Sequence, residues 1–171
     1  MPSSIKLLFK PRFGIVLLLM LVLLSSACGF RLRGFIELPQ NLQPLYISSQ
    51  SSANNLAATL ARQLEQSGVT LSKEIAPSRL RLELKDFKSS QRQVVFGQRE
   101  EFELSLQITA SARDSESEPL FSDEVLQAYR QYSYNSSTDS LLTRDSLRKE
   151  LLRSMEDDLI RQLTLRIRAL Q

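Results

Sequence analysis

The stretch Glu101-Phe102-Glu103-Leu104-Ser105-Leu106-Gln107-Ile108-Thr109-Ala110 alternates charged or polar and apolar side chains almost without a break. A period of two residues predicts a β-strand with one face on a core and one face in solvent. Residues 79–84 alternate in the same way. Residues 121–134 predict a third, longer strand, although Val125, Tyr129 and Tyr132 do not fall on one face, which suggests that both faces are partly covered there. The centre of the chain is therefore expected to be an antiparallel sheet.

Helical patterns flank these strands. Residues 53–67 carry leucines at every fourth position and are followed by Gly68, a residue that commonly ends helices. Residues 143–169 carry a second apolar stripe at the same spacing, formed by Leu147, Leu151, Met155, Leu159, Leu163 and Ile167. A short apolar run, Leu45-Tyr46-Ile47, precedes the first helix and predicts one more strand.

The predicted element order is strand, helix, three strands, helix. Helices and strands that each have one apolar face bury those faces against each other. We therefore expect an α+β fold: a two-layer sandwich whose mainly antiparallel sheet, of about four strands, has two helices packed on one face. The other face of the sheet is expected to be polar.

The first 27 residues read as a cleaved bacterial signal peptide. Three cations, Lys6, Lys10 and Arg12, precede an apolar run over residues 13–24, which small residues follow. The run is shorter than the roughly 20 residues that span a bilayer. The sequence thus predicts a signal peptide over residues 1–27 and a single periplasmic domain over residues 28–171.

Cys28 follows the small residues directly, and the stretch resembles the lipobox of bacterial lipoproteins. It departs from the usual box at Ser25, where leucine is common. The resemblance implies S-diacylglycerol and N-palmitoyl groups on Cys28, which anchor a protein stably to a membrane. In similar lipoproteins, an aspartate directly after the cysteine resembles an inner-membrane retention signal. This chain has Gly29 at that position, which favours the outer membrane. The alternative is ordinary signal cleavage that leaves a buried free thiol.

Composition excludes several classes of function. The chain has 22 basic and 19 acidic residues, and the three cations of the signal peptide account for the whole excess. Residues 28–171 are therefore formally neutral, so the basic pI gives no reason to expect a nucleic-acid partner. The sequence has no histidine and one cysteine. We expect no enzymatic activity, no metal site and no cofactor other than the covalent lipid.

A basic segment over residues 88–99 separates two of the predicted strands. Lys88, Arg92 and Arg99 lie around Phe96 in a segment without acidic residues, and Arg144 precedes the last helix. Guanidinium groups beside an aromatic ring suit a phosphorylated amphiphile. The alternative is a solvated hairpin tip whose cations balance the neighbouring glutamates Glu100, Glu101 and Glu103. Arg144 has the same two interpretations.

Several short motifs in order resemble the LptE (RlpB) family of lipopolysaccharide-assembly lipoproteins. They are Cys28-Gly29-Phe30-Arg31-Leu32-Arg33-Gly34, Leu45-Tyr46-Ile47, the helix ending at Gly68-Val69, Val94-Val95-Phe96-Gly97-Gln98 before Glu101-Phe102-Glu103-Leu104, and the long last helix. The resemblance implies a sheet with two helices.

The resemblance also implies a function. Members of this family are outer-membrane lipoproteins on the periplasmic side that plug the large β-barrel translocon LptD, help to assemble it and bind lipopolysaccharide. Their lipopolysaccharide contacts carry over to Arg92 or Arg99 and to Arg144. A different class, an auxiliary lipid-binding lipoprotein of an ABC-type lipid transport system, is the alternative function.

Overall fold

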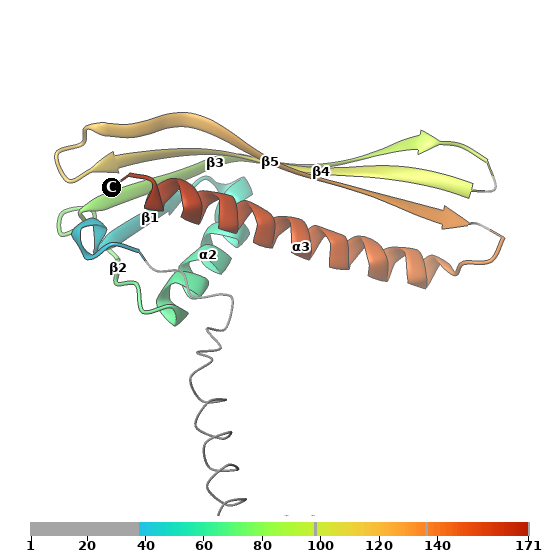
Figure 1. Ribbon diagram of the computed structural model, residues 1–171, viewed down its shortest axis with the longest axis horizontal. Coiled ribbons are helices and arrows are strands. Elements are labelled where there is room, and N and C mark those ends of the chain that lie inside the picture. Colours follow the sequence, from blue (N-terminus) through green and yellow to red (C-terminus); the bar gives the residue numbers. More distant parts are fainter. Residues whose placement is uncertain (1–37, 98, 136, 171) are drawn as a thin grey trace, which may run out of the picture. The chain divides into compact units, whose positions relative to one another are not determined.

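In the computed structural model, residues 38–97, 99–135 and 137–170 are described, and they form five strands, two α-helices and two short 3-10 helices (Figure 1). The predicted signal peptide and Cys28 lie outside these residues. The strands are β1 (Leu45–Ser49), β2 (Leu71–Ser72), β3 (Leu80–Val95), β4 (Arg99–Asp114) and β5 (Pro119–Asn135). The helices are η1 (Gln40–Leu42), η2 (Ser51–Ala53), α2 (Asn54–Gln66) and α3 (Leu141–Arg168).

One sheet contains all the strands in the order β2-β1-β3-β4-β5. β3, β4 and β5 form an antiparallel meander, whereas β1 pairs in parallel with both β2 and β3. Parallel neighbours need a crossover connection, and α2 supplies it between β1 and β2. The α+β fold is confirmed, with a mixed sheet of five strands in place of the expected four or so.

The alternation of β4 places its even-numbered residues in the core. Phe102, Leu104, Leu106, Ile108 and Ala110 are buried. Burying a leucine- or isoleucine-sized side chain stabilises a protein by roughly 1.5–3 kcal/mol, so this strand alone is a large share of the apolar core. The odd-numbered residues point to the opposite, outer face of the sheet.

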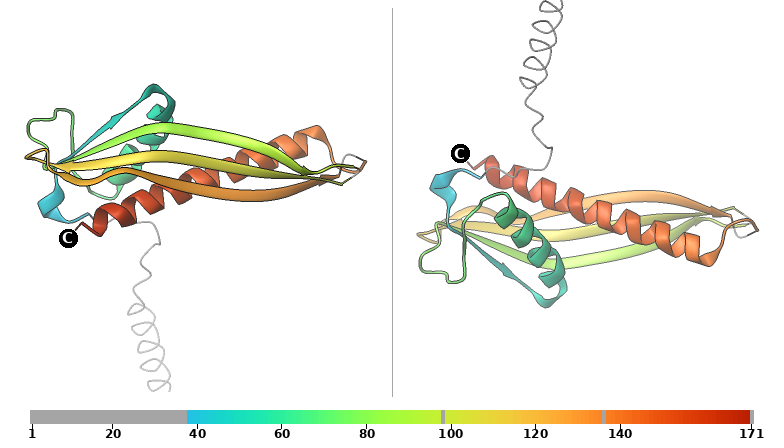
Figure 2. Two further views of the ribbon diagram at one scale, coloured as in Figure 1. Left: turned by 90° about the horizontal axis from the view of Figure 1, so that it is seen from above. Right: turned by 90° about the horizontal axis from the view of Figure 1, so that it is seen from below.

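Both α-helices cover the inner face of the sheet, and the outer face has no helix over it (Figure 2). α2 buries Leu56, Leu60 and Leu64, and α3 buries the stripe from Met155 to Ile167. The predicted helices, 53–67 and 143–169, agree with α2 and α3 to within two residues at each end. Gly68 takes a positive φ of 83° just after α2, and Val69 donates its N–H to the Leu64 carbonyl at 3.0 Å.

The two helices differ in reach. Figures 1 and 2 show that α3 runs along most of the sheet, while α2 covers only the half that contains β1 and β2. We call this half the proximal half; the distal half contains residues 88–95 of β3, the first residues of β4 and the last residues of β5. Within the described residues, no helix is both long and apolar enough to cross a membrane.

The basic segment predicted to separate two strands is mostly strand. β3 continues to Val95 and pairs with β4 along its whole length, with register shifts between Lys85 and Lys88 and between Gln93 and Val95. Residues 88–95 lack alternation because the sheet there has no cover from α2 on its inner face. Backbone pairing with β4 therefore extends the strand to Val95 without an apolar pattern, and β4 begins at Arg99.

Candidate functional site

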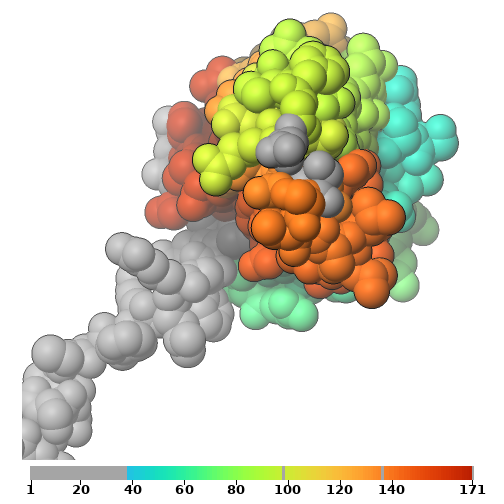
Figure 3. Space-filling view, turned by 90° about the vertical axis from the view of Figure 1, so that its right-hand side faces the viewer, coloured from blue at the N-terminus to red at the C-terminus, as the bar shows by residue number. Residues whose placement is uncertain are grey.

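The distal end of the sheet brings together two segments that are far apart in the sequence. β4 and β5 pair in a register that sets Arg99 opposite Asn135, so the β3–β4 turn and the connection from β5 to α3 lie at the same end. Figure 3 looks at this end and shows side chains of the β3–β4 hairpin above those of the first turns of α3. We call this region the distal tip.

Arg144 lies on the inner face at the distal tip. Its guanidinium carbon is 5.1 Å from the centre of the Phe102 ring and 5.4 Å from that of the Tyr134 ring. Phe102 in turn stacks on Tyr132 with ring centres 5.3 Å apart. No ion pair within residues 38–97, 99–135 and 137–170 involves Arg144. Because ring contacts engage the guanidinium face, its N–H edges stay available for an anion.

The start of α3 is fixed locally. Ser140 is the N-cap residue, and its hydroxyl accepts a hydrogen bond from the Thr143 N–H at 3.1 Å. The Tyr134 hydroxyl donates to the Asp139 carbonyl at 3.0 Å, which ties the end of β5 to the loop that leads into α3. These contacts hold the first turn of α3, and with it Arg144, against the aromatic rings.

Large apolar side chains are exposed at the distal tip. Phe96 is 75% exposed in the β3–β4 turn, and Leu141 and Leu142 are 67% and 80% exposed in the first turn of α3. Val95 and Leu147 are less exposed, at 41% and 37%. Exposed apolar groups gathered in one place mark interaction sites on soluble proteins, whereas scattered ones do not.

The predicted site residues divide into two groups. Phe96, Arg99 and Arg144 lie at the distal tip. Lys88 and Arg92 lie on the outer face, opposite Gln107 and Glu103 of β4. At about 3.3 Å per residue, Lys88 is about 26 Å along β3 from Phe96, so the structure does not bring it to the tip.

Arg92 has an acidic partner. Its Nη2 atom is 3.1 Å from the Glu103 carboxylate, and its side chain is 72% exposed. This pair matches the alternative interpretation, in which cations of the segment balance its glutamates. Surface pairs of this kind contribute little to stability. Between the two candidates carried over from the family, Arg99 is the one at the distal tip.

Leu141 and Leu142 were not expected from the sequence as site residues. The predicted helix began at residue 143, and these two leucines fall outside its four-residue stripe. Two adjacent leucines ahead of an amphipathic helix, and off its buried face, are the signal that would have identified them.

The groups with shifted pKa values lie away from the distal tip. Lys85 Nζ is 2.6 Å from Asp123 Oδ1, and this hydrogen bond raises the pKa of Lys85 and lowers the pKa of Asp123. Burial raises the pKa of Glu156 on α3, and the neighbouring Asp157 adds to the shift.

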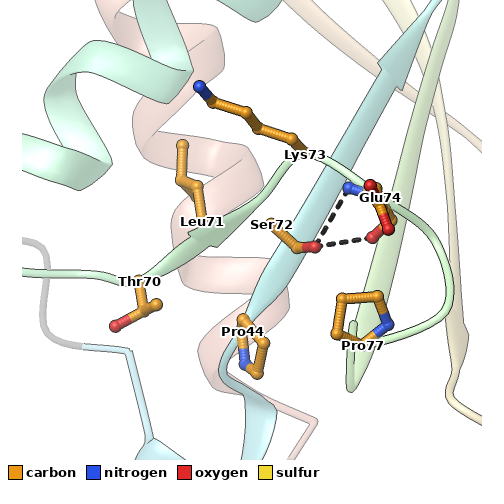
Figure 4. Close-up of a pocket in the computed structure, with 7 residues that line it drawn as sticks. All are labelled: Pro44, Thr70, Leu71, Ser72, Lys73, Glu74 and Pro77. Atoms are coloured by element: carbon orange, nitrogen blue, oxygen red, sulfur yellow. Dashed lines mark hydrogen bonds between the residues drawn. The ribbon is translucent and has the colours of Figure 1, made fainter.

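A shallow hollow lies at the proximal end, between the start of β1 and the β2–β3 connection (Figure 4). Pro44 and Pro77 lie on its two sides, and its volume is about 350 Å³. The Ser72 hydroxyl donates to the Glu74 carbonyl at 2.6 Å and accepts from the Glu74 N–H at 3.1 Å, which uses up polar groups that a ligand would need.

Solved structures of bacterial lipoproteins resemble this fold. A minor lipoprotein from Acinetobacter baumannii is 25% identical with a TM-score of 0.59, over 73% of this chain and 90% of that one. An uncharacterized lipoprotein B from Nitrosomonas europaea is 20% identical with a TM-score of 0.67, over 82% of this chain and 91% of that one. A search among curated proteins gives no match.

The family comparison covers most of the chain. The model of the LptE family, described as lipopolysaccharide-assembly, matches residues 42–167, from the end of η1 to the last turn of α3. This span includes every strand, the hairpin turn and Arg144. The chain therefore belongs to the LptE family of lipopolysaccharide-assembly lipoproteins.

Proposed function

We propose that this protein is an outer-membrane lipoprotein, lipid-anchored at Cys28, that binds lipopolysaccharide at the distal tip and plugs an LptD-like β-barrel. Family membership supports the role in lipopolysaccharide assembly. The observation that carries the binding site is the distal tip, where exposed Phe96, Leu141 and Leu142 lie at the same end of the sheet as Arg99 and Arg144. In this proposal the protein is not an enzyme and needs no cofactor.

The chemistry of the tip matches that of the ligand. Lipopolysaccharide is an anionic amphiphile that carries phosphate groups beside acyl chains. Arg144 presents its N–H edges beyond the Phe102 and Tyr134 rings, and guanidinium groups pair well with phosphate. Phe96 and Leu142 are exposed enough to lie against acyl chains. A tip with only cations, or only apolar groups, would match half of such a molecule.

The outer face of the sheet suits a polar barrel lumen. Uncharged side chains on this face hydrogen-bond to one another, Ser90 with Ser105 at 2.8 Å and Gln127 with Gln107 at 3.2 Å, and charged pairs such as Arg92–Glu103 lie beside them. A polar face of this kind makes hydrogen bonds and water contacts with a polar wall. The formal neutrality of residues 28–171 agrees with this arrangement.

Matched substitutions test the binding site. We expect Phe96→Ser combined with Arg99→Gln, and separately Arg144→Met, to weaken lipopolysaccharide binding by about tenfold or more, since one lost charge-assisted hydrogen bond is worth roughly that factor. The controls are Tyr129→Ser, an exposed aromatic residue on the outer face, and Arg168→Gln at the other end of α3. Pull-down with labelled lipopolysaccharide measures the effect. Equal losses in the control variants would reject the distal tip as the site.

Co-purification tests the partner. Membranes solubilised in mild detergent should yield this chain with a large outer-membrane β-barrel in equal amounts. Recovery with an inner-membrane transporter and no barrel would support the auxiliary lipid-transport role in its place. For the anchor, Cys28→Ser should abolish palmitate labelling, and labelling that persists would place the lipid on another residue.

A further inference from the structure

A second polar site lies on the outer face of the sheet, in the proximal half. The left view of Figure 2 looks onto this face. The strand registers place outward-pointing residues in two rows across β1, β3 and β4. The first row is Tyr46, Arg81 and Arg113, and the second is Ser48, Glu83 and Ser111.

The first row sets two arginines directly opposite each other. Like charges in facing positions of antiparallel strands destabilise a sheet. Neither arginine forms an ion pair among the described residues, and the nearby Asp123 carboxylate, which pairs with Lys85, interacts with Arg113 only at longer range. Their hydrogen bonds go to neutral acceptors in the β4–β5 turn: Arg81 donates to the Ser117 hydroxyl at 2.9 Å and the Ser115 carbonyl at 3.2 Å, and Arg113 to the Ser117 carbonyl at 3.2 Å.

One donor of this pair is left unused. The Nε atom of Arg81 is buried and has no hydrogen-bond partner. A buried donor on a charged group without an acceptor is costly and uncommon, so it marks a place where an acceptor is missing. An oxygen-bearing anion placed there would satisfy this N–H and also separate the two positive charges.

Arg81 also lines a cavity on this face. The two rows line it together with Ile75 and Leu82, and its volume is about 160 Å³. Pockets for small molecules have volumes of roughly 300–1,000 Å³, so this cavity fits a group of side-chain size and excludes a lipid or a nucleotide. The lining contains two arginines and one carboxylate, that of Glu83, so its net charge is +1. The neighbouring Lys85 is paired with Asp123.

We propose that this cavity receives the carboxylate of an aspartate or glutamate side chain from a partner protein. Arg113 neutralises the charge of the carboxylate, the Arg81 side chain turns to bring its buried Nε–H to it, and the Tyr46 ring and Ile75 contact the aliphatic stem. The site is a docking point on the outer face, remote from the distal tip. It stands on its own geometry, so it holds or fails independently of lipopolysaccharide binding.

Nuclear magnetic resonance of the arginine Nε–H groups tests the site on the full-length protein in detergent. The probe is the blocked tripeptide Ac-Ser-Glu-Ser-NH2, with Ac-Ser-Gln-Ser-NH2 and sodium chloride as controls at matched ionic strength. We expect a saturable shift of the Arg81 Nε–H signal with the glutamate peptide alone. Acetate should give the same shift at higher concentration, because it lacks the stem.

Variants separate this site from general surface charge. Arg113→Gln should weaken peptide binding by about tenfold or more, and Glu83→Gln should strengthen it by removing a like charge. Arg81 itself is not substituted, since it also holds the β4–β5 turn. An equal shift with chloride or with the glutamine peptide, acetate binding as tightly as the peptide, or binding that Arg113→Gln leaves unchanged would each overturn the proposal.

Discussion

Replacing Arg144 by methionine tests whether the arginine is held by the aromatic rings beneath it. Methionine keeps an unbranched stem of similar length and removes the charge. The guanidinium has two ring contacts, at 5.1 Å to Phe102 and 5.4 Å to Tyr134. Each such contact is worth about 0.5–1 kcal/mol at an exposed site, so we expect the free energy of unfolding to fall by about 1–2 kcal/mol.

A double-mutant cycle isolates the contact with Phe102. The variants are Arg144→Met, Phe102→Leu and the two combined, and urea unfolding followed by far-ultraviolet circular dichroism gives each free energy. We expect a coupling of about 0.5–1 kcal/mol between the two positions. Lys149→Met, at an exposed position on the same helix, is the control and should change stability by less than about 0.5 kcal/mol.

A coupling within about 0.3 kcal/mol of zero would refute this reasoning, because neighbouring residues that interact do not behave additively. It would mean that the Arg144 guanidinium is not held over Phe102 in solution. The same measurement separates stability from binding. If Arg144→Met loses lipopolysaccharide binding while the protein stays folded at the assay temperature, the loss reflects the missing charge.

Three further substitutions test local features. Ser140→Ala removes the N-cap of α3 and should lower the free energy of unfolding by about 0.5–2 kcal/mol in urea unfolding, with Ser140→Gly costing less. Gly68→Ala should cost about 1–2 kcal/mol because φ is +83°, although nothing lies within 4 Å of the added methyl group; Gly68→Asn should cost less. Asp123 has a lowered pKa and Lys85 a raised one, so their contribution is present at neutral pH and is lost as pH falls through the pKa of folded Asp123. The stability difference between the wild type and Lys85→Met should therefore shrink in acid, and a difference that does not depend on pH would contradict the pair.

The sequence predicted those parts of the fold in which one side of an element is apolar and the other polar. Residues 101–110 alternate because α3 covers one side of β4 and solvent the other. The two helices were located for the same reason. The parallel pairing of β1 with β2 was not predictable in this way, because β2 has only two residues and no period can be read from it.

The longest segment whose structure was predicted wrongly is residues 88–95. They were expected to separate two strands, and they are part of β3. This part of β3 has no α2 beneath it, so neither face requires apolar residues. β5 differed in another way. Val125 and Tyr129 point to the outer face, where they are 48% and 55% exposed, so the irregular alternation comes from apolar residues that lie on different faces. Tyr132, in contrast, is buried on the inner face.

The candidate site was only partly predictable. Phe96, Arg99 and Arg144 could be singled out from charge and aromatic content, but their meeting at one end depends on the register of β4 with β5. Lys88 and Arg92 were grouped with them because they are close in sequence. In an extended strand, each residue adds about 3.3 Å, so residues a few positions apart in sequence lie far apart in space. Successive side chains also point to opposite faces of the sheet.

α3 covers both halves of the sheet, and α2 covers the proximal half alone. The free energy of local opening should therefore differ between the two halves. The proximal half is held by two helices and five strands, and the distal half by one helix and three strands. Amide hydrogens in residues 88–95 and at the end of β5 should therefore exchange with solvent by small local openings, while those of residues 80–84 and 108–112 in the proximal half exchange only when the whole domain unfolds. A binding end that opens at little cost can reshape itself around a bulky ligand, while the rest of the domain stays folded.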